Sequence, residues 1–234
     1  MDTPDAFYGS TAKIARARAL IAELKKESET FAATNPVQLQ DMSIENDGQA
    51  ISITIHNEGV PHNISTIFGD VIHNLRASLD IAACGIVRAA GKSDSKVYFP
   101  FSDTNENLDK MIKEKHFDRA GPIAVELLRR LKPYADGNTS LRAIHDLDLQ
   151  DKHHKLIPVG QSYFSPVWRM LKDAGQPEIQ LVCQEITGYS LVFPPDCALA
   201  GERVIPTFEK LVDLVDGILV AFRNLSGDPL FPGS

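Results

Sequence analysis

The sequence predicts an α+β protein that is mainly a helical bundle with two short β-hairpins. Long stretches repeat apolar residues at helical spacing, and two shorter stretches alternate apolar and polar residues beside turn residues. The 234 residues contain no linker or low-complexity segment that would separate domains. A single domain over residues 1–234 is therefore expected, with hairpins near 39–56 and 178–194.

The N-terminal part of the chain predicts a helix followed by a hairpin. Apolar residues recur every three or four positions over Ser10–Ala33, and Asn35-Pro36 ends the pattern. Alternating isoleucines at 51–55 face a second extended stretch at 39–45 across the turn sequence Asn46–Gly48. We expect these two stretches to pair.

The central part of the chain contains the strongest helical pattern, a continuous apolar stripe over Ile64–Val87 that Gly91 ends. The segment Val97–Phe101 reads as a short extended piece. Further helices are expected near 105–115, near 123–131, and from Asn138 or Thr139 to Pro158.

The C-terminal part predicts a second hairpin and a last helix. The stretches 178–185 and 189–195 flank Thr187-Gly188, which is the expected turn between two strands. An amphipathic helix is expected over Val204–Leu225, and its broad apolar surface would serve either as core or as a dimer interface.

Composition indicates a soluble cytoplasmic protein. The chain is 43% hydrophobic with a net charge of −7, a balance that argues against coating nucleic acid through bulk charge but allows local contact with RNA. No apolar run approaches the roughly 20 residues of a membrane span. The first residues lack the basic and apolar regions of a secretory signal. Three cysteines without a CxxC pair indicate reduced thiols.

One polar motif lies within the predicted central helix. In "GDVIHNLRASLD" (69–80), His73, Arg76 and Asp80 are spaced i, i+3, i+7 and share one side of a helix. Arg76 borders the apolar stripe and could aim its guanidinium into a groove. The alternative is an intrahelical Arg76–Asp80 pair worth at most a few tenths of a kcal/mol, with His73 solvated.

A second polar motif, "HDLDLQDKHHKL" (145–156), occupies positions where a helix would continue its buried face. Leu141 and Ile144 set that face, and the next turns place charged residues on it: Asp148, Asp151 and Lys152. An unpaired buried charge costs several kcal/mol. Either the helix end emerges into water, or these charges find partners in a polar pocket.

We infer that the two motif helices lie side by side and pool their polar faces. Asp148 or Asp151 would hold Arg76, and the Arg76–Asp151 pair is the contact on which this inference depends. Lys152 would meet Asp80. His153 or His154 would face His73.

The residue types in this cluster suit chemistry on an anion. Arginine and lysine stabilise anionic oxygens, and histidine passes protons near neutral pH. Phosphoryl transfer or RNA cleavage by general acid/base catalysis fits them, and neither a metal nor a cofactor is expected. A single ion held by His145, Asp148 and His153 has only weak support from spacing, and no Glu-x-x-His pair is present.

The motifs resemble a known group of sequences. "GDVIHNLRASLD", then "YFPF", then "LKPYADGNTSLRAIHDLDLQDKHHKL" is similar to a group of uncharacterised bacterial and phage proteins with a GD-x-x-HNLR-x-x-LDH run and a later DKHR-x-L segment. That group in turn resembles the HEPN superfamily. The resemblance implies a helical, usually dimeric protein of toxin–antitoxin or phage-defence systems. Many such proteins are metal-independent ribonucleases with an Arg-x(4–6)-His motif.

Carried onto this chain, the resemblance makes Arg76 the motif arginine, but the group's histidine position is Ile81. His73, His153 or His154 would have to replace that histidine in space, or this chain retains binding without catalysis.

The resulting expectation is a HEPN-like homodimer that acts on RNA or a nucleotide and does not enter a membrane. Arg76 would bind the scissile phosphate, and His73 or His153 would move protons. Three carboxylates would orient these groups and one lysine would add positive charge: Asp80, Asp148, Asp151 and Lys152. Two alternatives stay open, a non-catalytic nucleotide- or anion-binding or protein-interaction module, and a purely structural ion-pair network.

Overall fold

The computed structural model of the chain describes residues 5–34, 38–45, 50–56, 59–153, 158–173 and 176–227. At residues 38–45, 50–56, 153, 162–173 and 176–188 it describes the backbone alone. Helices make up most of this structure and two antiparallel hairpins complete it, which confirms the predicted mainly helical α+β class.

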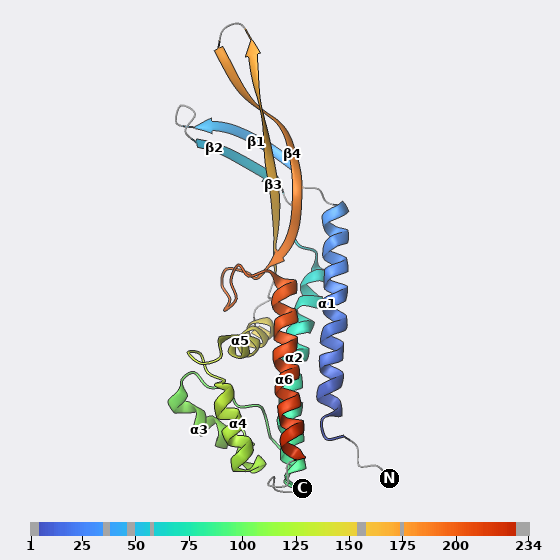
Figure 1. Cartoon of the computed structure of the whole chain (residues 1–234), viewed down its shortest axis with the longest axis vertical. Coiled ribbons are helices and arrows are strands. Elements are labelled where there is room, and N and C mark those ends of the chain that lie inside the picture. The colour runs from blue at the N-terminus through green and yellow to red at the C-terminus, as the bar shows by residue number, and fades with distance from the viewer. Residues whose placement is uncertain are drawn as a thin grey trace.

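Three long helices run beside one another and form the main body of the protein (Figure 1). They are α1 (Tyr8–Thr34), α2 (His62–Ala89) and α6 (Val204–Ser226). Their apolar faces meet in one hydrophobic core, to which α2 contributes eleven residues. The expected boundaries of all three helices are reproduced within a few residues, because their apolar periodicity is sustained over many turns.

Shorter helices cover one side of this body (Figure 1). They are α3 (Asn105–Glu114), the 3₁₀ turn η1 (Phe117–Ala120), α4 (Pro122–Leu131) and α5 (Thr139–His153). Asn138 caps α5, since its Oδ1 accepts the Leu141 backbone N–H at 3.0 Å. The expected helices near 105–115 and 123–131 and the predicted start of α5 are therefore confirmed.

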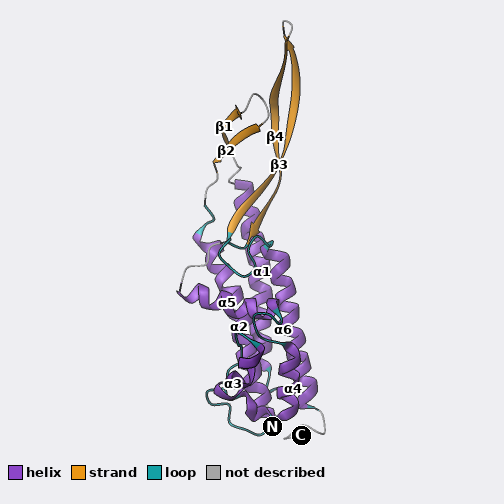
Figure 2. Cartoon of the chain, turned by 90° about the vertical axis from the view of Figure 1, so that its left-hand side faces the viewer, coloured by secondary structure: helices purple, strands orange, loops and turns teal. Residues whose placement is uncertain are grey.

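Two separate two-stranded hairpins leave the bundle at the end opposite the start of α1 (Figures 1 and 2). β1 (Gln38–Glu45) pairs with β2 (Ala50–His56), as the sequence predicts; the turn at Asn46–Gly48 lies outside the described residues. β3 (Val159–Asp173) pairs with β4 (Gln176–Val192).

The predicted position of the second hairpin is wrong. Both stretches expected to be separate strands belong to β4, and their partner is β3, which the sequence did not suggest. Gly188 is not in a turn: it pairs with Tyr163, next to a register shift, where a strand glycine commonly marks a bulge. Pro166 argued against a strand in this region, because proline is excluded from central strands. A two-stranded sheet has only edge strands, however, and there proline is tolerated. This hairpin is also long, with strands of 15 and 17 residues.

The apolar face of α6 is core rather than an exposed interface. Nine of its residues are buried, and Phe208 and Phe222 are completely inaccessible. Phe208 packs against Phe68 of α2 and Phe193, with ring centroids 5.0 and 5.4 Å away. Of the two readings that the sequence left open for this helix, the structure therefore selects the core.

Small residues allow α1 and α2 to approach closely. The Ser10 and Ser78 hydroxyls are 2.8 Å apart, and each donates to the other's backbone carbonyl, at 2.9 and 3.1 Å. Nearer the start of α1, Gly85 lies against the preceding segment: a Cβ at this position would stand 2.8 Å from the Ala6 carbonyl oxygen. Only small side chains therefore separate the two backbones at these positions.

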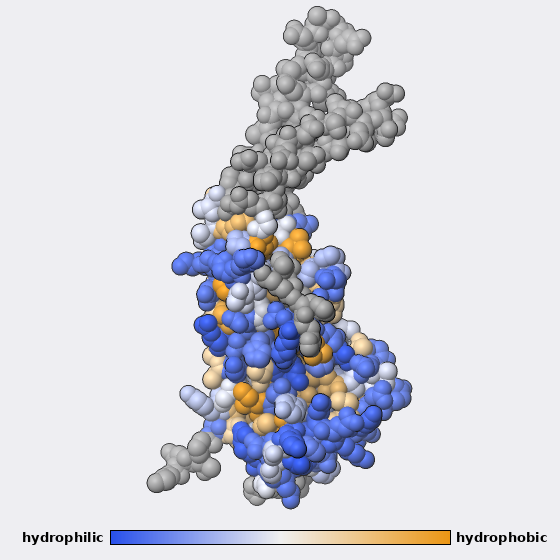
Figure 3. Space-filling view, turned by 180° about the vertical axis from the view of Figure 1, so that it is seen from behind, coloured by the Kyte–Doolittle hydropathy of each residue, from blue (hydrophilic) through white to orange (hydrophobic). Residues whose placement is uncertain are grey.

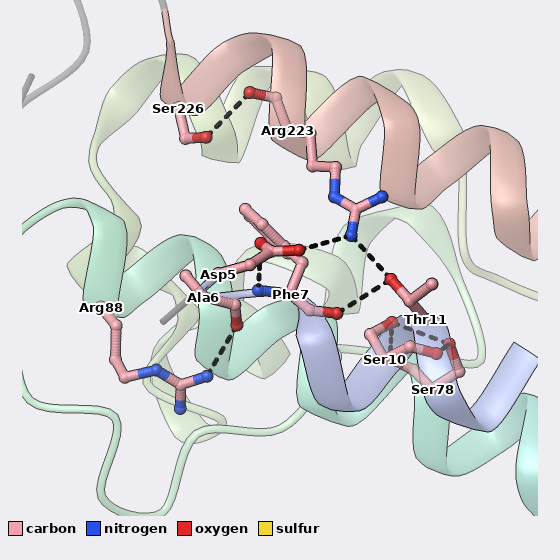
Figure 4. Close-up of polar contacts among 9 residues, drawn as sticks. All are labelled: Asp5, Ala6, Phe7, Ser10, Thr11, Ser78, Arg88, Arg223 and Ser226. Carbon is pink, nitrogen blue, oxygen red and sulfur yellow. Dashed lines mark hydrogen bonds and ion pairs between the residues drawn. The ribbon is translucent and has the colours of Figure 1, made fainter. Parts of the chain in front are cut away.

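Two arginines tie the segment before α1 to the neighbouring helices (Figure 4). Arg223 of α6 donates to Asp5 at 2.8 Å and to the Thr11 hydroxyl at 2.6 Å. Arg88 of α2 donates to the Ala6 carbonyl at 2.9 Å. The start of α1 is thus fixed beside the end of α6.

The described surface of the bundle seen from behind is mostly hydrophilic, with hydrophobic residues in small separate areas (Figure 3). The large apolar side chains that reach solvent are spread over several elements: Tyr8, Tyr98, Ile123, Leu149, Val159 and Val220.

Candidate functional site

The polar faces of α2 and α5 meet, as the sequence led us to infer. A Cβ on Gly69 would stand 2.7 Å from both carboxylate oxygens of Asp151, so Asp151 lies directly against the α2 backbone. One turn further along α2, His73 contacts Asp148. These contacts fall in opposite order along the two helices, so α2 and α5 run in opposite directions where the two motifs meet.

Asp148 is the centre of the cluster. Its side chain is 5% exposed, and its Oδ1 lies 3.2 Å from His73 Nδ1 while its Oδ2 lies 2.5 Å from Lys152 Nζ. The side chains of His73 and Lys152 are each 51% exposed. An ionised carboxylate only accepts hydrogen bonds, so this contact favours the His73 tautomer with its proton on Nδ1, which leaves Nε2 as an acceptor. A buried acid therefore orients two solvent-facing groups.

The expected Arg76–Asp151 pair does not form. Arg76 Nη1 lies 2.6 Å from Asp80, its partner one turn later in the same helix, whereas Asp151 lies against Gly69, about two turns before Arg76. Asp148 does not hold Arg76 either. The intrahelical pair prevails because it needs no particular register between two helices.

The expected Lys152–Asp80 pair does not form either, since Lys152 contacts Asp148 within α5. Asp80 is engaged at the other end of the cluster, where its Oδ1 accepts the Phe99 backbone N–H at 2.8 Å. Each of the two alternatives for the charged end of α5 holds for one of its residues. Asp148 is buried with polar partners, and Lys152 reaches solvent.

Arg76 takes part in an aromatic stack that the sequence did not reveal. Its guanidinium carbon lies 4.9 Å from the centroid of the Phe101 ring, and the His145 ring stacks on Phe101 with centroids 4.7 Å apart. His145 Nδ1 is buried without a hydrogen-bond partner, whereas the buried Arg76 Nη1 has the ion pair with Asp80 as its polar contact. Burial first, then the positive charges of Arg76 and Arg142, lowers the pKa of His145 to about 4. His145 is therefore neutral at physiological pH.

A second arginine–aspartate pair mirrors the first. Arg142 Nε donates to Asp146 at 2.8 Å, and its other nitrogens contact Asp103 and the Ser102 carbonyl. The hexapeptides "LRASLD" (75–80) and "LRAIHD" (141–146) share the same pattern, L-R-A-x-x-D. This repeat is the signal that sequence reasoning missed. Together the two pairs hold both ends of the segment 99–103 between α2 and α5.

The described side chains do not support the single-ion site of His145, Asp148 and His153 that spacing weakly suggested. The backbone of His153 ends α5 and its side chain lies outside the described residues, as does all of His154. His145 stacks on Phe101, whereas Asp148 contacts His73 and Lys152. Within the described ranges, no group of three or more His, Cys, Asp or Glu side chains is arranged to hold a metal ion.

The chain was compared with known protein families, proteins and structures. No protein-family model, curated protein or solved structure matches the chain. Among the helices of the described ranges, none combines the length and apolar character that crossing a bilayer requires.

Proposed function

We propose that this chain is a HEPN-like protein of a host–phage conflict or toxin-type system that cleaves RNA without a metal ion. The observation that supports this most directly is the buried Asp148 carboxylate, which contacts both His73 and Lys152 while those two side chains stay half exposed. A carboxylate that orients an imidazole, with an ammonium group beside it, suits proton transfer next to an anionic phosphate.

In the proposed reaction, His73 Nε2 takes the proton from a ribose 2′-hydroxyl. The 2′-oxygen then forms a bond to the adjacent phosphorus, and the bond from phosphorus to the 5′-oxygen breaks. The leaving 5′-oxygen takes a proton from water, and His73 returns its proton to solvent. Asp148 stabilises the imidazolium that forms, and Lys152 offsets charge on the phosphate oxygens.

Arg76 has a different role in this proposal from the one that the sequence suggested. Its side chain is only 11% exposed and is engaged by Asp80, so we assign the phosphate contact to Lys152. Arg76 and Asp80 act as positioning residues for the segment that carries Phe101. Asp151 orients the cluster from its place against Gly69 of α2.

The proposal includes a cytoplasmic homodimer, because the resemblance to HEPN proteins implies dimers. Sedimentation velocity at several protein concentrations tests this directly: we expect a species of twice the 25.7 kDa chain mass. A species that stays at the mass of one chain would contradict it.

A second candidate function is anion or nucleotide binding without turnover. The observation that favours it is the state of Arg76, whose charge is already paired with Asp80, together with Ile81 at the position of the group's histidine. In this case Lys152 and His73 would hold a phosphate group, or organise a protein partner, without proton transfer.

The test is cleavage of end-labelled single-stranded RNA by the purified protein, with and without EDTA. We expect cleavage that EDTA does not suppress and that His73→Ala and Asp148→Asn each lower by at least about 100-fold, in line with the usual contribution of general acid/base catalysis. Lys152→Ala should lower it less, since a half-exposed ammonium is partly replaced by water and salt.

Matched controls separate the site from general surface charge. His62→Ala removes a histidine from the same helix, and Lys110→Ala removes a lysine that, like Lys152, pairs with an acid one turn away. Both should cleave normally. If the unaltered protein leaves RNA intact but a nucleotide or phosphate raises its melting temperature, the binding function replaces the nuclease. Cleavage that His73→Ala does not change would refute the proposed chemistry.

A further inference from the structure

The segment Val97–Phe101 presents one aromatic side chain to solvent. Val97, Phe99 and Phe101 are 3%, 1% and 5% exposed, whereas Tyr98 between them is 51% exposed. A single exposed aromatic side chain is common on protein surfaces and assigns no role by itself. The surroundings of Tyr98 distinguish it from the other exposed apolar residues.

Backbone hydrogen bonds hold Tyr98 in place. Its N–H donates to the Lys115 carbonyl at 3.2 Å, and the next N–H, that of Phe99, donates to Asp80 at 2.8 Å. Further along, the Ser102 N–H donates to the Pro133 carbonyl at 3.1 Å. The exposed ring therefore stands on a fixed backbone, which lowers the conformational entropy that a ligand would have to overcome.

A cation accompanies the ring. Lys115 Nζ lies 5.8 Å from the Tyr98 ring centroid. The charge of Lys115 also contributes to the lowered pKa of His145, so Lys115 lies within electrostatic reach of the Arg76–Phe101–His145 stack. An exposed aromatic ring with a neighbouring cation is the combination on which single-stranded nucleic acids stack their bases.

The segment that carries the ring is tied to α2 about two turns from His73. Asp80, which holds Phe99, follows His73 by seven residues on the same side of α2. That interval is about 10 Å along a helix axis, comparable to three stacked bases at about 3.4 Å each. A single strand with a phosphate at His73 and Lys152 would therefore extend to the segment that carries Tyr98 within a few nucleotides.

We propose that Tyr98 and Lys115 form a stacking platform for a nucleobase of single-stranded RNA. This inference rests on the proposed function and extends it, because it names the base, besides the phosphate, as a recognised part of the substrate. Stacking tolerates any base but requires that a base be present.

Fluorescence anisotropy with two labelled dodecamers tests the platform: oligoadenylate RNA, and a strand of the same length in which the central residues lack their bases. Tyr98→Ala should weaken binding of oligoadenylate about tenfold and leave binding of the abasic strand unchanged. Tyr98→Phe should bind both strands normally, because the ring remains. Lys115→Ala should weaken both strands and reduce the salt dependence.

The control is Tyr8→Ala, which removes another exposed tyrosine, 73% accessible, from α1. It should bind both strands as the unaltered protein does. Normal binding of oligoadenylate by Tyr98→Ala, or equal weakening for both strands, would overturn the platform. If cleavage still depends on His73 in that event, the proposed nuclease stands without it. If the unaltered protein neither binds nor cleaves RNA, both proposals fail together.

Discussion

Replacing Asp148 by leucine separates a functional role of the buried carboxylate from a structural one. The change puts an apolar side chain of similar size at a position that is 3% exposed. It removes the contacts to His73 at 3.2 Å and Lys152 at 2.5 Å, two side chains that are each 51% exposed. If the carboxylate is present for chemistry, its loss should not lower the free energy of unfolding.

The expected change in the free energy of unfolding follows from the burial of Asp148 and the exposure of its two partners. Because His73 and Lys152 are 51% exposed, each contact contributes about 0.5–1 kcal/mol. Removing a carboxylate from water costs several kcal/mol, and apolar replacements of buried ion pairs are often neutral or stabilising. We therefore expect Asp148→Leu to be as stable as the unaltered protein or more stable by about 1–2 kcal/mol, and to lose RNA cleavage.

Asp148→Asn should behave differently. It leaves a buried polar group but removes the charge, so both charge-assisted contacts weaken and the amide N–H groups face other donors. We expect the free energy of unfolding to fall by about 1–2 kcal/mol. For a chain of this size, each kcal/mol lowers the melting temperature by about 2–4 °C.

The assay is urea denaturation at pH 7, followed by circular dichroism. Leu147→Ala, at the neighbouring and fully buried position of α5, is the positive control and should cost about 2–5 kcal/mol. If Asp148→Leu is instead less stable than Asp148→Asn, the cluster is an ion-pair network that holds α2 and α5 together. That result would support the purely structural reading of the two motifs.

Two further predictions concern stability. In the folded chain the pKa of His145 is about 4, against 6.5 for an unperturbed histidine, so the unfolded chain binds the proton more readily and stability should fall as pH drops from about 6.5 towards 4. We expect the free energy of unfolding to fall by about 2 kcal/mol over this range, after allowance for partial exposure. His145→Phe should abolish this part of the pH dependence when denaturation is measured at several pH values. An unchanged pH profile would show that His145 is not the group responsible. Gly85→Ala places a Cβ 2.8 Å from the Ala6 carbonyl and should cost about 1–3 kcal/mol, whereas Gly217→Ala, which meets open space, should not destabilise the helix; equal melting temperatures for the two variants would argue against the close packing of Ala6 on α2.

The helices could be predicted from the sequence because burial imposes a regular period on them. Apolar spacing located α2 and α6 within a few residues. The β3–β4 hairpin could not be located in the same way. Gly188 resembles a turn residue but lies at a register shift inside β4, and Pro166 disguises a strand that has no inner position in a larger sheet.

The candidate site could be predicted only in part. Charged residues on the buried face of α5 correctly indicated that α2 and α5 share a polar surface. The individual pairs could not be predicted, because they depend on the register between two helices, which the sequence of neither helix determines. Arg76 therefore pairs with Asp80 rather than Asp151. Phe101 and Arg142 were missed because their roles arise only when the segment 99–103 is placed between the helices.

The contact between Asp5 and Arg223 has a practical consequence. At one end of the helical body it joins the segment before α1 to the last turns of α6 at 2.8 Å, while both hairpins leave from the opposite end (Figure 2). The 27 residues of α1 separate these ends by about 40 Å. A fluorophore or surface linker attached near either chain end would therefore leave the hairpins free, and a donor–acceptor pair placed across this length would report whether they bend towards the bundle.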